Sequence, residues 1–370
     1  MKILIFSTAY RPLVGGAELA IQEITARLPE HQFDLICAKI KPELADEEKI
    51  GAVTIYRLGN GSAWDKKLLP LRAFFKALSL HRQNRYDLLW VVMASYASLA
   101  ALFLKLLYPR VPLLLTLQEG DSKEHIYRQM GWFKPLFRRV FKKADCVQAI
   151  SNYLAEWAKE MGAKAPIEVV PNGVDLRHSE PRLGGANNLL SQDDRSKTVI
   201  TVSRLEPKNG LADLIRAITF LSGVKLLIVG GGSLEGELKK LAQELGVVER
   251  VKFLGQVEPE EVSRYLSLAT VFCRPSLSEG LGSVFLEAMA VGLPVVGTPV
   301  GGIPDFLQDG ETGLFCEPGN PKSIAAAIKR LLDNPALRER LAANGQKLVK
   351  EKYDWNLIAQ KMNSLFKRLI

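Results

Sequence analysis

Continuous apolar runs of strand length alternate with helix-length segments along most of the 370-residue chain. In the first half these runs read KILIFS, FDLICA, VTIYRL, DLLWVV, VPLLLTL, CVQAIS and IEVVP, and segments between them, such as 17–28 and 153–161, have the pattern of helices. Runs that are apolar throughout, rather than at every second residue, are typical of strands covered on both faces. The alternation therefore predicts a parallel, doubly wound α/β sheet.

The pattern pauses at residues 173–197, which are rich in Gly, Asn, Ser and Pro and show no periodicity. It restarts with TVITVSR, KLLIVGG, VKFLG, TVFCRP, LPVVGT and TGLFCEP, and ends in a helical pattern. A chain of this length exceeds one ordinary core. We therefore expect two Rossmann-like domains that face a cleft, residues 1–172 and 198–350, with a linker at 173–197. A helix at 351–370 should follow, and whether it crosses back to the N-terminal domain is left open.

The composition, 47% hydrophobic and 24% charged residues, is typical of a soluble globular protein. The longest uncharged run, residues 88–104, is explained by a buried strand that leads into a helix, although its length is close to that of a membrane span. The opening MKILIFSTAY has strand length, so no cleavable signal is expected. The cysteines and histidines lack metal-ligand spacing, which favours reduced structural thiols and no metal site; the cysteines are Cys37, Cys146, Cys273 and Cys316.

The stretch SLSEGLGSVFLEAMAVG, residues 276–292, has the features of an anion- and sugar-binding turn. Ser283 is a suitable N-cap for a helix, whose first free N–H groups favour a phosphate. Glu279 and Glu287 lie on either side of this helix start, and a carboxylate accepts hydrogen bonds from a vicinal diol. The stretch thus outlines a site for a sugar nucleotide. A capped core helix with two solvated glutamates is the alternative.

Several other motifs occur in order along the chain: GGAE at 15–18, PNGVD at 171–175, SRLEPKNG at 203–210, GQVEPEEV, and GGIPDFLQDGETGLF. Together with the glutamate pair spaced by seven residues, this ordered set resembles the retaining GT-B glycosyltransferases of family 4, also described as glycosyl transferases group 1. The resemblance covers essentially the whole chain. It implies a GT-B architecture of two Rossmann-like domains, and transfer of a sugar from a nucleotide donor.

The resemblance also assigns roles to individual residues. Glu287 should bind the ribose hydroxyls and Glu279 a hydroxyl of the transferred sugar, while Arg204 and Lys208 offer two cations to the leaving diphosphate. Val257 occupies the position whose main chain contacts the base. The expected donor-binding residues are Gly15, Gly16, Arg204, Lys208, Val257, Glu279, Gly280, Leu281, Gly282, Ser283, Val284 and Glu287.

The expected catalytic residues are Glu279, Arg204, Lys208 and Gln118. Gln118 stands where many family members have a histidine near the anomeric carbon. Glutamine can orient a hydroxyl but cannot act as a base, so the departing phosphate is expected to help deprotonate the acceptor. No Asp-x-Asp pair is present, so we expect no metal, and no cofactor is expected either. A UDP-linked sugar is expected as the donor in preference to a GDP-linked one.

The acceptor is expected to be a hydroxyl of a lipid-linked or cell-envelope glycan. A soluble small-molecule acceptor, or a nucleotide-sugar epimerase of the same architecture, are the alternatives. A nicotinamide dehydrogenase is disfavoured because the glycines of VGGGSLEGEL are one residue out of step with the dinucleotide fingerprint. These glycines are Gly230, Gly232 and Gly236.

The net charge of +9 is concentrated in one segment. Residues 123–143 carry seven Lys or Arg against one acidic residue, and the cations are interleaved with Trp132, Phe133, Phe137 and Phe141. Such a segment favours either an anionic membrane surface or a solvated helix whose aromatic residues pack inward. Nucleic acid is not expected, since no binding motif accompanies the charge. The expected location is the cytoplasm, with peripheral attachment to the inner face of the membrane left open.

Overall fold

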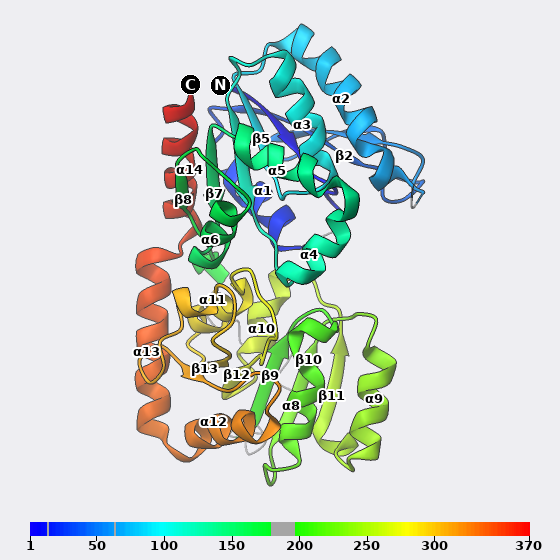
Figure 1. The fold of residues 1–370 in the computed structure, drawn as a ribbon. Helices are drawn as coiled ribbons and strands as arrows, with labels where there is room; N and C mark the ends of the chain where they lie inside the picture. Colours follow the sequence, from blue (N-terminus) through cyan, green and yellow to red (C-terminus); the bar gives the residue numbers. More distant parts are fainter. Residues whose placement is uncertain (13–14, 63, 179–196) are drawn as a thin grey trace. The chain divides into compact units, whose positions relative to one another are not determined.

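The computed structural model describes residues 1–12, 15–62, 64–178 and 197–370. The chain divides into two compact α/β units (Figure 1). The N-terminal unit comprises Met1–Asn172 together with Trp355–Ile370, and the C-terminal unit comprises Gly173–Asp354. Most of the expected linker at 173–197 lies outside the described residues.

The N-terminal unit is built on an eight-stranded sheet in the order β3-β4-β2-β1-β5-β6-β7-β8. All neighbouring strands are parallel except the pair β3 and β4. Its strands are β1 (Lys2–Phe6), β2 (Gln32–Ala38), β3 (Glu47–Ile50), β4 (Val53–Leu58), β5 (Leu88–Val92), β6 (Leu113–Leu117), β7 (Cys146–Ala149) and β8 (Ile167–Val169). Its helices are α1 (Gly16–Ala26), α2 (Asp65–Asn84), α3 (Tyr96–Leu107), α4 (Lys123–Met130), α5 (Lys134–Lys143), α6 (Asn152–Glu160) and α14 (Trp355–Leu369).

The apolar runs become the central strands of this sheet because helices cover both of its faces. Every residue of β5 and β6 is buried. The uncharged run at 88–104 is thus a strand that leads into α3, as the sequence predicts. In the part of the chain that the structure describes, no helix is both long enough and apolar enough to span a bilayer.

The last helix, α14, completes the core of the N-terminal unit. Its residues Trp355, Ile358 and Phe366 are buried in the same cluster as β1, β2 and β5. The Phe366 ring lies 5.2 Å from that of Trp90 on β5, with an edge-to-face geometry. The helix begins at Trp355 rather than at 351, because α13 (Pro335–Lys352) continues to Lys352 before the chain turns.

The C-terminal unit is built on a six-stranded parallel sheet in the order β11-β10-β9-β12-β13-β14. Its strands are β9 (Thr198–Val202), β10 (Lys225–Val229), β11 (Val251–Gly255), β12 (Val271–Cys273), β13 (Val295–Gly297) and β14 (Leu314–Phe315). Its helices are α8 (Leu211–Ile218), α9 (Glu235–Glu244), α10 (Val262–Leu266), α11 (Ser283–Ala290), α12 (Pro321–Asp333) and α13.

Both sheets have a point where the strand order reverses, which is where doubly wound sheets bind their ligands. In the N-terminal unit the reversal lies between β1 and β5, and in the C-terminal unit it lies between β9 and β12. The predicted site residues lie after the carboxyl ends of these and neighbouring strands. All four cysteines are buried and free, as expected of structural thiols.

Candidate functional site

Two loops at the reversal point of the C-terminal sheet are in direct contact through a backbone hydrogen bond and close packing. The loop after β9 carries Arg204 and Lys208, and the loop after β12 carries Glu279. The backbone N–H of Leu277 donates to the carbonyl of Lys208 at 2.7 Å. Gly210 lies against the carbonyl oxygen of Pro275 so closely that a Cβ would approach this oxygen to 2.0 Å. The structure therefore brings the predicted cations and the predicted sugar-binding carboxylate to one edge of the sheet.

Arg274 holds Glu279 in place, and sequence reasoning missed this arginine. Its guanidinium forms an ion pair with the Glu279 carboxylate and donates through Nε to the Ser276 hydroxyl at 3.0 Å. It also lies over the Phe285 ring, 5.5 Å from the ring centre. The side chain is buried at the end of the apolar strand β12. A cation that follows the apolar run VFC was the signal in the sequence, because a buried arginine requires partners.

Glu287 lies in the second turn of α11 and is electrostatically coupled to the same arginine. Burial raises the pKa of Glu287 to about 7, and the positive charge of Arg274 acts against this rise. Burial lowers the pKa of Arg274 to about 10; Glu287 opposes that shift and Arg204 adds to it. The two glutamates of the motif thus share one buried cation, and Glu287 changes its charge near neutral pH.

The start of α11 differs from the prediction in its cap. We expected Ser283 to be the N-cap, but Ser283 is the first helical residue and Gly282 takes the cap position without a side-chain hydrogen bond. Gly282 has a φ of +93°, and a Cβ there would lie 2.9 Å from the Phe285 ring. A left-handed backbone in tight contact requires glycine, so the cap position could not be given to serine.

The backbone around Glu279 is tied to the loop that follows β13. The carbonyl oxygen of Glu279 accepts a hydrogen bond from the Gly302 N–H at 3.2 Å. Gly301 has a φ of +56°, and a Cβ on it would lie 1.7 Å from the same oxygen. The carboxylate oxygen Oε1 accepts from the Gly280 N–H at 3.0 Å. The side chain of Glu279 is therefore positioned by its own loop, by Arg274 and by the next loop of the sheet.

Two of the three glycines considered for a dinucleotide fingerprint, Gly230 and Gly232, serve a packing role, whereas Gly236 has no heavy atom within 4 Å of a Cβ built on it. Gly230, at the end of β10, has a φ of +128°, and a Cβ there would lie 1.9 Å from the carbonyl oxygen of Ser203. Gly232 also lies close to the backbone of Leu205, where a Cβ would approach to 2.6 Å. Val257 follows β11 and is partly buried. These contacts press the turn after β10 onto the loop that carries Arg204.

The N-terminal unit contributes Gly15, Gly16 and Gln118 of the predicted residues. Gly15 is the N-cap of α1 in an extended conformation, and Gly16 is the first helical residue. The Gln118 side chain exchanges two hydrogen bonds with the buried amide of Asn172, at 2.8 and 3.1 Å. A Cβ on Gly16 would lie 3.9 Å from the Asn172 amide nitrogen. The turn after β1 and the end of β6 therefore meet at Asn172, which sequence reasoning did not single out.

Glu119, the neighbour of Gln118, is a buried acid to which the sequence analysis assigned no role. Its carboxylate accepts from the backbone N–H of Ala94 at 2.6 Å and from that of Gln118 at 2.9 Å. Burial raises the pKa of Glu119 to about 7, against the effect of these hydrogen bonds. The carboxylate joins the ends of β5 and β6 and so fixes the backbone that presents Gln118.

The basic segment at 123–143 forms two helices, α4 and α5, joined by the 3-10 turn η1 (Gly131–Phe133). Phe137 and Phe141 are buried, whereas Trp132 is fully exposed and Phe133 is 55% exposed. Arg138 and Arg139 on α5 are exposed. The aromatic residues are thus divided between the core and the surface, so neither of the two expected arrangements describes all four.

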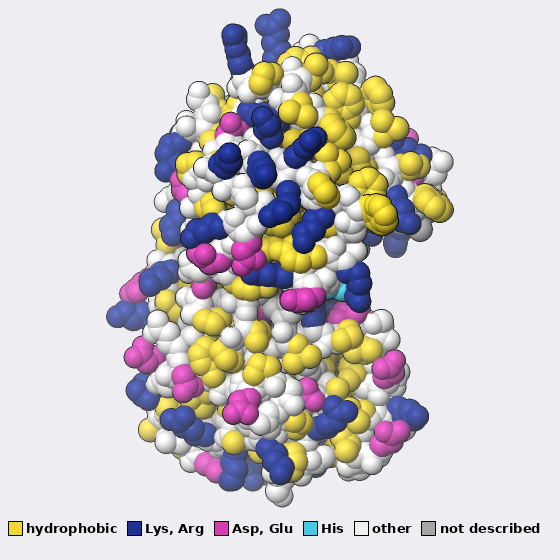
Figure 2. Space-filling model, in the orientation of Figure 1, with side chains coloured by type: hydrophobic (Ala, Val, Ile, Leu, Met, Phe, Trp, Pro, Cys, Tyr) yellow, Lys and Arg dark blue, Asp and Glu magenta, His cyan; other side chains and the backbone are white. Residues whose placement is uncertain are grey.

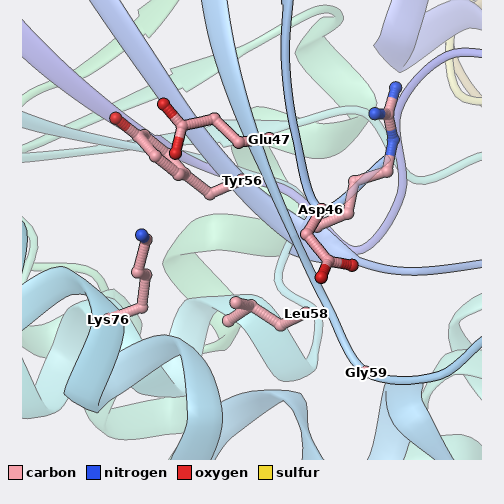
Figure 3. A pocket seen from close by; sticks show the side chains of 7 residues that line it. Asp46, Glu47, Tyr56, Leu58, Gly59 and Lys76 are labelled. Carbon is pink, nitrogen blue, oxygen red and sulfur yellow. The ribbon is translucent and has the colours of Figure 1, made fainter. Parts of the chain in front are cut away.

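A surface pocket of about 240 Å³ lies elsewhere on the N-terminal unit (Figure 3). Tyr56 and Lys76 line it, and the Lys76 ammonium lies 4.1 Å from the centre of the Tyr56 ring. None of the predicted site residues contributes to this pocket. Within the residues that the structure describes, no group of three or more His, Cys, Asp or Glu side chains is arranged to hold a metal ion.

Comparison with known proteins identifies the family of this chain. Residues 189–348 match the family model of the glycosyl transferases group 1, and residues 14–178 match that of Glycosyltransferase Family 4. An uncharacterized glycosyltransferase from Methanocaldococcus jannaschii is 35% identical over 99% of this chain and 98% of its own length. This chain belongs to glycosyltransferase family 4.

Other relatives of this family 4 glycosyltransferase carry more specific names. A GDP-mannose-dependent alpha-(1-6)-phosphatidylinositol monomannoside mannosyltransferase from Mycobacterium tuberculosis is 32% identical over 63% of this chain, and the chain spans 66% of that protein's length. Among solved structures, sucrose-phosphate synthase from Thermosynechococcus elongatus matches all of this chain and 98% of its own, with a TM-score of 0.88 and 24% identity. The architecture is therefore GT-B, as predicted.

Proposed function

We propose that this family 4 enzyme transfers a hexose-type sugar from a nucleoside-diphosphate donor to a hydroxyl group, with retention of the anomeric configuration. The observation that carries the proposal is that one arginine interacts with both glutamates of the motif. Arg274 forms an ion pair with Glu279 and interacts electrostatically with Glu287, which lies on α11. Two carboxylates beside free helix N–H groups provide acceptors for hydroxyls and donors for phosphate.

In this proposal Glu287 accepts hydrogen bonds from the ribose, and Glu279 accepts one from the transferred sugar. Residues 280–284 offer backbone N–H groups to the sugar and the phosphates, while Val257 contacts the base through its main chain. Arg204 and Lys208 neutralise the charge that develops on the leaving diphosphate. Gly15, Gly16 and Gln118 provide the remaining contacts from the N-terminal unit.

We further propose that transfer needs no divalent metal and that the donor is linked to UDP. The cations of the loop after β9 and the N-terminus of α11 can neutralise the leaving group without a metal ion. EDTA should then leave the rate unchanged. Loss of activity in EDTA that magnesium or manganese restores would contradict the metal-independent step. The name of the M. tuberculosis relative makes GDP the alternative base to include.

The acceptor is proposed to be a lipid-linked or envelope glycan, because the name of the mycobacterial relative includes a phosphatidylinositol monomannoside. The exposed Trp132 and the cations of α5 support contact with the inner face of a membrane through residues 123–143. The substitution of both Arg138 and Arg139 by Glu should weaken binding to anionic vesicles, and equal binding of the variant would remove this segment from the proposal.

The deciding experiment is a panel of UDP- and GDP-linked sugars offered to the purified protein with membrane extracts and with soluble sugars as acceptors. We expect transfer from one donor and an NMR spectrum of the product that shows the anomeric configuration of the donor. Glu287→Ala should weaken nucleotide binding at least tenfold, since it removes the carboxylate that accepts hydrogen bonds from the ribose. Unchanged nucleotide affinity in a folded variant would refute the site, and inversion of the anomer would refute retention. A change of the donor sugar itself, without acceptor, would indicate an epimerase.

A further inference from the structure

Helix α2 presents a stripe of large apolar side chains to solvent, in addition to the face that it buries. Trp64, Leu68, Leu71 and Phe75 are 66%, 43%, 60% and 59% exposed. Their spacing of four, three and four residues places them within about 60° of one another around the helix axis. On the opposite side, Leu69, Ala73, Ala77 and Leu80 are buried in the unit. Helix α2 is thus apolar on two opposite sides, and its own unit covers only one of them.

The stripe continues onto the neighbouring helix α3. The Phe74 ring lies edge-to-face with Phe75, 5.4 Å between centres, and with Phe103 of α3, 6.2 Å between centres. Near the end of α3, Leu106 and Leu107 are each more than half exposed. Figure 2 shows hydrophobic side chains gathered over α2 and α3 of the N-terminal unit, with Lys and Arg around them. Single exposed leucines are ordinary, but a continuous apolar patch of this kind marks an interaction surface.

Helices α2 and α3 themselves carry almost only positive charges. Helix α2 carries five Lys or Arg residues and one acid, Asp65, which is buried and paired with Arg72. Helix α3 contains no acidic residue. Lys67 lies over the Trp64 ring, 4.6 Å from its centre, so a cation accompanies the apolar stripe at its first residue. The partner must therefore offer both an apolar phase and negative charge.

We propose that the exposed faces of α2 and α3 form a bilayer-docking surface, in which Trp64, Leu71 and Phe75 enter the interface of an anionic membrane while the flanking lysines contact lipid headgroups. Amphipathic helices that lie in the interface have this combination of apolar residues and cations. A second copy of the chain fits less well, because a symmetric dimer would bring the same cations of both copies together.

This docking surface is distinct from residues 123–143. Its purpose would be to bring a membrane-linked acceptor to the enzyme, and this purpose rests on the proposed function. Vesicle binding can be measured without donor or acceptor. A failed vesicle experiment would therefore leave the transfer reaction standing, and a wrong donor assignment would leave the docking surface standing.

The first test compares vesicle co-sedimentation of the wild type with that of Leu71→Gln/Phe75→Gln. Gln is a good helix former, so the exposed face changes polarity while the helix is kept. Phe220→Gln is the matched control, since Phe220 is 53% exposed on the C-terminal unit. We expect the double variant to bind vesicles of phosphatidylglycerol and phosphatidylcholine at least tenfold more weakly, and the control to bind as the wild type does. Equal binding of the double variant would overturn the proposal.

The second test places Trp64 relative to the bilayer. Among the five tryptophans, Trp90, Trp157 and Trp355 are buried, so Trp64 and Trp132 are the two that can sense lipid. In Trp132→Phe, we expect vesicles with brominated acyl chains to quench the Trp64 fluorescence. Vesicle binding without any quenching of Trp64 in this variant would show that the stripe stays outside the membrane and would refute docking through α2.

Sedimentation velocity decides between a bilayer and a second copy. We expect the wild type to sediment as the Leu71→Gln/Phe75→Gln variant does, with no dimer that depends on the stripe. A wild-type dimer that the double substitution dissociates would assign the apolar face to self-association instead and overturn the membrane proposal.

Discussion

The raised pKa of Glu287 predicts that Glu287→Gln stabilises the C-terminal unit at alkaline pH while it weakens donor binding. An ordinary glutamate loses its proton near pH 4.5, whereas burial keeps the Glu287 proton until about pH 7. The folded protein therefore binds this proton more tightly than the unfolded chain does. The stability that comes with it is complete below about pH 4.5 and is lost as the pH rises through about 7.

The magnitude follows from the difference between the two pKa values. At pH 8 the desolvated carboxylate costs about 3 kcal/mol, because one pKa unit corresponds to about 1.4 kcal/mol. At pH 5.5 only about one unit of the difference has been expressed, so the cost is about 1 kcal/mol. A neutral glutamine avoids this cost. The advantage of Glu287→Gln should thus be about 2 kcal/mol larger at pH 8 than at pH 5.5.

The assay must observe the C-terminal unit itself. All five tryptophans belong to the N-terminal unit, so tryptophan fluorescence would not follow the unfolding of β9 and β12. Native-state hydrogen exchange of peptides from these strands, in urea, gives the free energy of opening for wild type and variant at each pH. Glu279→Gln is a suitable comparison, since that carboxylate is paired directly with Arg274. A Glu287→Gln variant that is less stable at pH 8, or equally stabilised at both pH values, would refute the reasoning.

Three further predictions concern the same site. Donor affinity measured by calorimetry should rise between pH 6 and pH 8 as the Glu287 carboxylate forms, and this rise should vanish in Glu287→Gln; an unaltered pH profile in the variant would assign the titration to another group. Arg274→Met should destabilise the C-terminal unit by about 3 kcal/mol because it leaves the Glu279 carboxylate without its cation, and Arg274→Met/Glu279→Gln should recover part of this stability. Both changes can be measured by hydrogen exchange. Gly301→Ala should destabilise by several times the roughly 1 kcal/mol expected for Gly319→Ala, since both have positive φ but only Gly301 faces the Glu279 carbonyl; similar urea midpoints would contradict the contact.

Among the residues that the structure describes, the apolar runs of the sequence predicted every strand but one, because buried parallel strands are apolar throughout. The strand they missed is β3, whose sequence EEKI is polar because it pairs only with β4 at the edge of the sheet. Helix α2 was not singled out in the sequence analysis either. Its apolar residues occupy two opposite sides, which removes the contrast between faces on which helix recognition depends.

The candidate site was partly readable for a similar reason. Glu279 and Glu287 stand in a local motif, whereas Arg274 and Glu119 gain their importance from contacts between separate strand ends. Ser283 was expected to cap α11 because serine is a common cap, but the tight contact of Gly282 with Phe285 decides the position. Local sequence preferences thus indicate the elements, and the contacts between loops depend on the assembled sheet.

The placement of α14 in the N-terminal unit has a consequence for synthesis on the ribosome. Residues 1–172 emerge first, yet their core lacks Trp355, Ile358 and Phe366 until the end of this sequence has been translated. Residues 173–354 are continuous and are complete before that point. Domains generally fold in the order of their synthesis, but here the unit that contains residues 1–172 is completed after the unit formed by residues 173–354. Until then Trp90 and its neighbours form an open apolar surface, which is the kind of nascent chain that chaperones recognise.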